Sequence, residues 1–132
     1  MKWFTIAELY RSNTADRLGI NNRCKQEHIT ALTALVDNVL DPLREWWEKP
    51  LVVSSGYRCP ELNSAVKGSK TSQHMMGQAA DIDTGDRQQN KLLFEYIRKN
   101  LPFDQLIDES NFAWVHVSFR ADGNNRNQVL SL

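Results

Sequence analysis

Three residues of the types that bind transition metals stand in two short segments of this sequence. His74 and Asp81 lie seven positions apart in "SQHMMGQAAD", and His116 lies in "WVHVSF". Imidazole nitrogens and carboxylate oxygens are common zinc ligands, and three protein ligands leave a fourth tetrahedral position for water, as in catalytic zinc sites. A histidine on a strand and a solvated aspartate also have ordinary structural roles. The metal interpretation therefore depends on whether the fold brings the three together.

The segment around His116 has the alternation of a half-buried strand. Val115, Val117 and Phe119 alternate with Trp114, His116 and Ser118. Because successive strand residues point to opposite faces, the first set is predicted to enter the core and the second to line a polar face.

The segment that carries Asp81 is also predicted to be a strand. In "AADID", Asp81 and Asp83 share one face, opposite Ile82. The small residues before Asp81 have a steric reason. Gly77 permits a turn that a residue with a Cβ resists, and the two alanines of the strand let it approach the metal loop closely.

The other predicted elements place helices early in the chain and strands later. Thr5 and Glu8 form a capping box at the start of a short helix, and Gly19 ends a second one. A long helix runs from Ile29 to Trp47, with a kink or break expected at Pro42. The later segments in chain order are predicted to be a strand "LVVSS", a helical turn "CPELNSAV", a strand "AADID", a helix "DRQQNKLLFEYIRKN" and a hairpin of "FDQLIDE" and "WVHVSF". This order predicts an α+β fold with a mostly antiparallel sheet and flanking helices.

Length and composition fit one globular domain over residues 1–132, which we expect to be a monomer. Hydrophobic residues make up 41% of the chain, and 16 basic residues balance 16 acidic ones. A balanced charge argues against nucleic acid or an anionic membrane as the main partner. No signal peptide or membrane span is visible, so we expect synthesis in the cytoplasm. Cys24 and Cys59 are expected to stay reduced thiols, with a disulfide as the alternative.

The compound pattern resembles the M15 family of zinc peptidases, which includes D-alanyl-D-alanine carboxypeptidases and dipeptidases. The residues that carry the resemblance are Ser72, His74, Gly77, Ala79 and Asp81, followed by Trp114 and His116. The upstream "SGYR" segment resembles the M15A branch, and the likeness runs through almost the whole chain. The resemblance implies a fold like that of Hedgehog signalling domains and DD-peptidases. It is greatest to short, single-domain members that phages and prophages often encode.

The resemblance also implies roles for single residues. His74, Asp81 and His116 would bind one zinc ion. Arg58 matches an arginine that binds substrate and stabilises the oxyanion, which suits a permanently charged guanidinium. Ser72 matches a serine near the substrate. Its alternative role is a loop hydroxyl that satisfies local backbone.

The general base is where the sequence departs from the family. Several members place a glutamate three positions before the last histidine, where this chain has Ala113. Glu109 is the nearest upstream carboxylate and our candidate base, with Asp108 and Asp83 as further candidates. Many members also carry a histidine where Trp114 stands, so Trp114 is expected to contact substrate instead.

The expected function is zinc-dependent cleavage of peptide bonds in bacterial peptidoglycan stem peptides, as a carboxypeptidase or an endopeptidase. A phage or prophage protein would reach the wall by release, as an endolysin does, or as part of the virion. The alternative is a zinc-stabilised module, weakly active or inactive, that binds cell wall or serves as a virion component. The absence of a glutamate at Ala113 favours that alternative.

Overall fold

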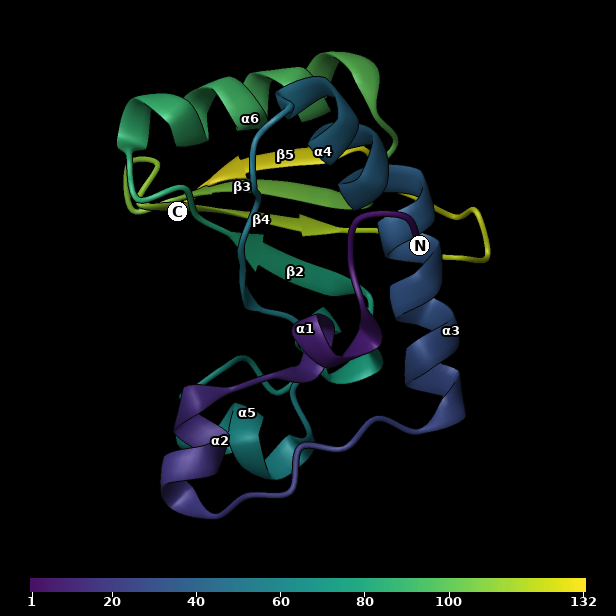
Figure 1. Cartoon of the computed structure of the whole chain (residues 1–132), viewed down its shortest axis with the longest axis vertical. Helices are drawn as coiled ribbons and strands as arrows, with labels where there is room; N and C mark the ends of the chain where they lie inside the picture. The colour runs from purple at the N-terminus through teal and green to yellow at the C-terminus, as the bar shows by residue number, and fades with distance from the viewer.

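The computed structural model describes residues 1–132 and contains one five-stranded sheet. Its order is β1-β2-β4-β3-β5 (Figure 1). All neighbouring pairs are antiparallel except β3 and β5, which are parallel. The predicted α+β class with a mostly antiparallel sheet is therefore confirmed. The strands are β1 (Val53–Ser55), β2 (Ala79–Ile82), β3 (Gln105–Glu109), β4 (Trp114–Ser118) and β5 (Gln128–Ser131).

Two helices have the end signals predicted for them, while α3 begins at Gln26, three residues before the predicted start. Thr5 and Glu8 form the capping box of α1, and Gly19 ends α2 in the left-handed conformation. Asp86 caps α6 through its side chain. The elements are α1 (Ile6–Tyr10), α2 (Asn13–Leu18), α3 (Gln26–Leu35), α4 (Asp41–Trp47), α5 (Pro60–Ala65) and α6 (Arg87–Asn100), with a short 3₁₀ helix, η2 (Gln73–Met76).

The long helix is not broken at Pro42. A π-helical turn, η1 (Val36–Leu40), joins α3 to α4, and the amide of Asp41 bonds to the carbonyl of Val36. Pro42 then stands in the first turn of α4, where a missing N–H costs little. The widened turn lets the chain continue past the proline.

The core lies between one face of the sheet and the helices α3, α4 and α6. Val115 and Val117 are fully buried in it, as the strand alternation predicts, together with Ile82 of β2 and Leu106 of β3. In Figure 1, α6 lies at one end of the molecule, while α2 and α5 lie together at the other. The second face of the sheet is left for polar side chains.

That second face carries a row of aligned residues. Asp81 of β2 is paired with His116 of β4, and His116 is paired with Ile107 of β3. Because alternate residues share a face, Trp114 and Glu109, which pair with each other, lie on it as well. Asp83 does not. It follows the end of β2 and accepts bonds from Gly85 and Asn90 at the start of α6.

The last strand was not predicted. β5 pairs with β3, and Leu132 exchanges backbone bonds with the β3 end through Asp108 and Ser110. None of the helices is long and apolar enough to span a bilayer. Both cysteines are free thiols, and burial raises the pKa of Cys24 to about 11.

Candidate metal centre

Three side chains from different elements converge on one point beside the sheet. The Nδ1 atom of His116 lies 2.9 Å from Oδ1 of Asp81, and Nε2 of His74 lies 3.3 Å from the same oxygen. One ligand atom from each of the three residues falls within 4.8 Å of the others. Two strands fix Asp81 and His116, and η2 brings His74 over them. The grouping expected from the sequence is therefore present.

His74 is held so that one chosen nitrogen faces the group. Its side chain is 2% exposed, and its Nδ1 lies 2.7 Å from the carbonyl oxygen of Gly56. That contact leaves Nε2 free toward Asp81. Metal-binding histidines usually have their second ring nitrogen bonded in this way, because the bond fixes the tautomer and ring orientation.

Close backbone contacts keep Gly56 and η2 in place. A Cβ at Gly56 would collide with the carbonyl of Leu9 in α1, so α1 packs directly behind this segment. At the other end of η2, Gly77 has φ of +72°, and a Cβ there would come within 2.7 Å of the carbonyl oxygen of His28. Ser72 caps η2 by accepting from the amide of His74, so its hydroxyl also satisfies local backbone.

The electrostatics of the group suit a cation. Burial by itself raises the pKa of Asp81, but the imidazoles of His116 and His74 outweigh it and hold that pKa below its usual range. Asp81 is therefore an anion that faces two imidazole nitrogens. Two nitrogens and one carboxylate oxygen match a common donor set of catalytic zinc sites. The residues present fit one zinc ion.

A cleft of about 600 Å³ opens over the group. Arg58, Ser72, Glu109 and Trp114 all line it, beside the three converging residues. The structure thus brings together in one cleft the residues predicted for metal binding, catalysis and substrate contact. Ala113 does not line it.

Among the candidate bases, Glu109 is the one that lines this cleft. Asp108 points to the other side of β3, where its carboxylate accepts from the amide of Phe112 at 2.6 Å. Asp83 is engaged by the turn before α6. The connection after Glu109 is tight, because Ser110, Asn111 and Phe112 all have positive φ. It returns the chain at once to Trp114.

Arg58 is a partly buried cation at the edge of the cleft. Its amide donates to the carbonyl of His74 at 3.0 Å, which ties its backbone to the ligand turn. Its Nε is buried without a partner. Burial lowers the pKa of Arg58, and the nearby Asp81 carboxylate opposes that shift. The guanidinium therefore has unused capacity for an anionic group.

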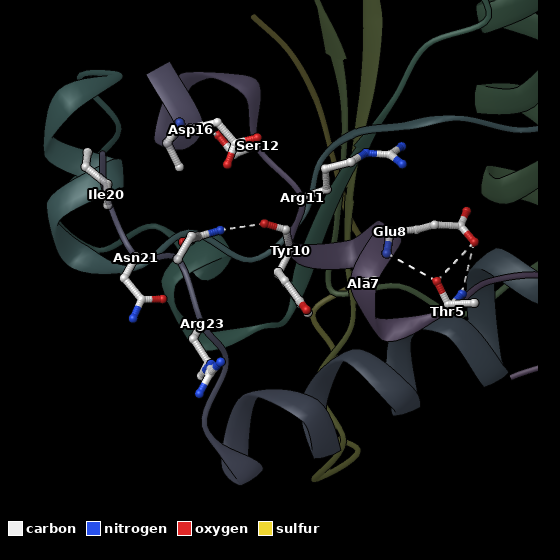
Figure 2. A pocket seen from close by; sticks show the side chains of 12 residues that line it. Thr5, Ala7, Glu8, Tyr10, Arg11, Ser12, Asp16, Ile20, Asn21 and Arg23 are labelled. Atoms are coloured by element: carbon white, nitrogen blue, oxygen red, sulfur yellow. Dashed lines mark hydrogen bonds between the residues drawn. The ribbon is translucent and has the colours of Figure 1, made fainter. Parts of the chain in front are cut away.

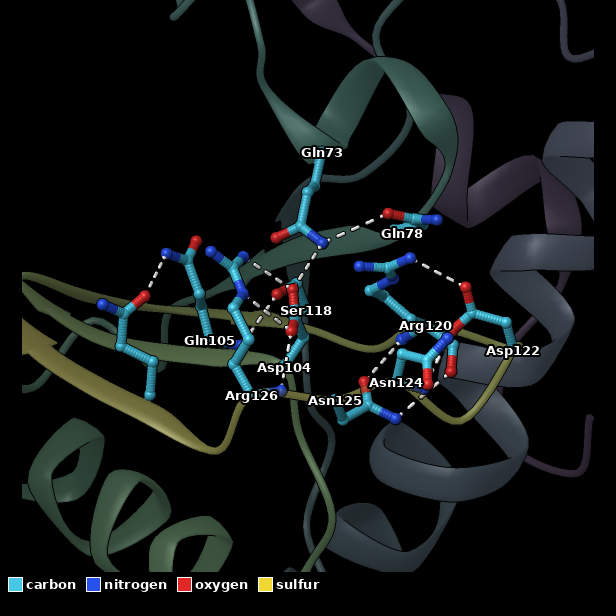
Figure 3. A network of polar contacts seen from close by, with 11 residues as sticks. Gln73, Gln78, Asp104, Gln105, Ser118, Arg120, Asp122, Asn124, Asn125 and Arg126 are labelled. Atoms are coloured by element: carbon cyan, nitrogen blue, oxygen red, sulfur yellow. Dashed lines mark hydrogen bonds and ion pairs between the residues drawn. The ribbon is translucent and has the colours of Figure 1, made fainter.

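An ion pair with a buried carboxylate supports the ligand turn. Asp104 is fully buried and accepts from Arg126 and from the side chain of Gln73, the residue next to His74 (Figure 3). The Arg126 side chain holds the pKa of Asp104 at about 2, although burial opposes the shift. Sequence reasoning missed these residues. The only signal was an aspartate directly before a strand.

Comparisons with known proteins agree with this arrangement. A family model described as Peptidase M15 matches residues 2–118. The chain is also 35% identical over 85 residues to a protein of Streptomyces albus G named zinc D-Ala-D-Ala carboxypeptidase. That match covers 64% of this chain and 32% of the relative. The chain thus spans about a third of the length of the curated relative it matches.

Proposed function

This chain belongs to the peptidase M15 family, and on that premise we propose that it is a zinc-dependent peptidase that cleaves peptidoglycan stem peptides. The observation that carries the proposal is the convergence of His74, Asp81 and His116 within 4.8 Å at the base of a cleft. The name of the Streptomyces relative supports a substrate that ends in D-Ala-D-Ala.

His74 and Asp81 would hold zinc through Nε2 and Oδ1, and His116 through Nδ1. When bound there, zinc would act as a Lewis acid that polarises the scissile carbonyl and acidifies a water molecule. The Gly56 carbonyl keeps the His74 ring oriented, because it occupies Nδ1. The pairing of β2 with β4 holds the other two ligands.

Glu109 is the proposed general base. Its carboxylate would take a proton from the attacking water, whose oxygen bonds to the carbonyl carbon, and would deliver that proton to the nitrogen of the leaving amine as the C–N bond breaks. Support comes from the position of Glu109 in the cleft. Asp108 and Asp83 instead accept hydrogen bonds from nearby backbone amides.

Arg58 is the proposed anion-binding group. A guanidinium with an unpartnered Nε can bind a substrate carboxylate or the negative charge that develops on the carbonyl oxygen. Trp114 offers an aromatic wall and Ser72 a hydroxyl on the same cleft, and we assign both to substrate contact.

The test is digestion of purified peptidoglycan by the zinc-loaded protein, followed by mass spectrometry of the muropeptides. Release of free D-alanine would identify a carboxypeptidase, and new internal amino termini would identify an endopeptidase. If neither product forms, the enzyme proposal is overturned. The candidate function left would be a zinc-stabilised wall-binding module, which the alanine at position 113 favours.

A further inference from the structure

A second pocket adjoins the cleft on the far side of Arg58. Its volume is about 400 Å³, and it shares Arg58 and Asp81 with the cleft. Residues of the α1–α2 connection, of α2 and of β1 form its walls, among them Arg11, Asn13 and Ser54. The pocket and the cleft therefore meet at Arg58 and Asp81.

The pocket is positively charged. Its charged residues are Arg11, Arg58 and Asp81, and Asp81 already faces the two histidines of the metal group. Neither arginine takes part in an ion pair anywhere in the structure. Figure 2 shows the Arg11 side chain extending away from Asp16, the acidic residue of the neighbouring helix. Two guanidinium groups thus border the pocket, and neither forms an ion pair with a protein carboxylate.

One buried side chain fixes the backbone beside both arginines. Asn22 is 8% exposed, and its amide donates to the carbonyl of Tyr10 at 2.7 Å and to that of Tyr57 at 3.0 Å. Its carbonyl oxygen accepts from the amide of Cys59 at 2.7 Å. Tyr10 precedes Arg11, and Tyr57 and Cys59 flank Arg58. The bond to Tyr10 is drawn in Figure 2. The backbone segments that carry the two arginines are therefore held together by one side chain.

We infer that this pocket is a carboxylate subsite, in which Arg11 joins Arg58 in binding the free carboxylate of the terminal residue of a substrate peptide. Two neighbouring guanidinium groups can bind a carboxylate through several charge-assisted hydrogen bonds. The inference rests on the proposed function and deepens it. Arg11 becomes a specificity-determining residue, and peptides with a free carboxyl terminus next to the scissile bond become the preferred substrates.

The first test compares two peptides, N-acetyl-L-Lys-D-Ala-D-Ala and its C-terminal amide, as substrates of the zinc-loaded protein. The parent should prefer the acid. Arg11→Gln should raise KM for the acid on the order of ten-fold with kcat little changed, because a charged hydrogen-bond donor is lost. Its preference for the acid should fall accordingly. The matched control is Arg17→Gln, an exposed arginine of α2 that does not line the pocket, and it should behave like the parent.

A binding measurement separates the subsite from catalysis. The same acid and amide pair, with the scissile amide replaced by a methyleneamine bond, cannot be hydrolysed and is titrated calorimetrically into zinc-loaded protein. The acid should bind more tightly than the amide. Arg11→Gln should weaken acid binding on the order of ten-fold, and added salt should shrink that difference.

Equal affinity for acid and amide in the parent, no measurable binding of the acid, or an unchanged preference in Arg11→Gln would overturn the subsite. Arg11-dependent binding of the acid without cleavage of either peptide has a different meaning. It would leave the subsite standing and refute the proposed peptidase function.

Discussion

His116 and Asp81 face each other across the pairing of β4 with β2, and their ligand atoms lie 2.9 Å apart. Two of the three candidate ligands are thus positioned by sheet hydrogen bonds, which makes their geometry as rigid as the fold itself. His74 reaches the same oxygen from η2, a short turn held by the Gly56 carbonyl and by Gly77. The centre therefore depends on both the sheet and the turn.

The first prediction concerns metal content. His116→Ala removes one of three ligands, and two ligands hold zinc far less tightly than three, so the purified variant should lose most of its zinc. Elemental analysis gives the zinc per chain. His28→Ala is the control, because His28 caps α3 at the amide of Lys25 and lies outside the group; it should keep about one zinc. Full retention of zinc in His116→Ala would remove that residue from the site.

The second prediction concerns the base. Glu109→Gln should keep zinc and fold but lose on the order of 10²-fold or more in kcat, because the amide cannot accept the proton of the attacking water. Steady-state hydrolysis of a stem peptide measures it. Glu95→Gln, on α6 across the sheet, should retain parental activity. Activity of Glu109→Gln within a few-fold of the parent would assign the role to another group.

The third prediction concerns the pair formed by the buried Asp104 and the half-exposed Arg126. Asp104→Asn should lower the free energy of unfolding by on the order of 2 kcal/mol at neutral pH, because the buried carboxylate that accepts charge-assisted bonds from Arg126 is lost. Urea denaturation measures the loss. Asp122→Asn breaks an exposed pair with Arg120 and should cost much less. Equal losses of unfolding free energy in Asp104→Asn and Asp122→Asn would show that the Asp104 pair stabilises the fold no more than an exposed pair does.

The same pair gives a pH dependence. The pKa of Asp104 is about 2 in the folded state, against an ordinary value of 3.8. A lowered pKa stabilises the folded state above the ordinary value, and the stabilisation is lost as pH falls through the folded pKa. The difference between the parent and Asp104→Asn should therefore be full at pH 6 and shrink toward pH 2. If the difference in unfolding free energy does not change between pH 6 and pH 2, ionisation of Asp104 does not stabilise the fold.

The fourth prediction concerns Gly77. Gly77→Ala places a Cβ 2.7 Å from the carbonyl oxygen of His28 at a positive φ, so the turn that carries His74 must shift. Stability should fall by about 1–3 kcal/mol, and zinc affinity should fall with it. Gly123→Ala is the control, because Gly123 has a similar φ of +82° and open space around the Cβ. It measures the cost of alanine at a positive φ without a steric contact. Equal zinc affinity in the two variants would show that the contact with His28 does not position the ligand.

Local patterns in the sequence predicted the parts of the fold that local forces determine. The alternation through His116 gave a buried and a polar face, and Thr5, Gly19 and Asp86 mark helix ends where the structure has them. The compound motif grouped His74, Asp81 and His116, because the spacing of a family motif carries information on tertiary structure that composition lacks.

What the sequence did not predict depends on contacts between distant segments. β5 has no clear alternation and forms because the edge of β3 is open to it. The π-turn before Pro42 answers a steric conflict that a helical pattern does not contain. Asn22 and Asp104 matter through bonds to residues far along the chain, such as Tyr57 and Arg126, so neither belongs to a local motif.

The most direct test of the central claim is a zinc titration of metal-free protein, with hydrolysis of a peptide ending in D-Ala-D-Ala as the readout. If His74, Asp81 and His116 form one catalytic zinc site, turnover should be absent without metal and rise with added zinc. It should reach its plateau at one equivalent per chain, and a chelator should abolish it. Turnover that does not depend on zinc, or no product at full zinc loading, would contradict the account.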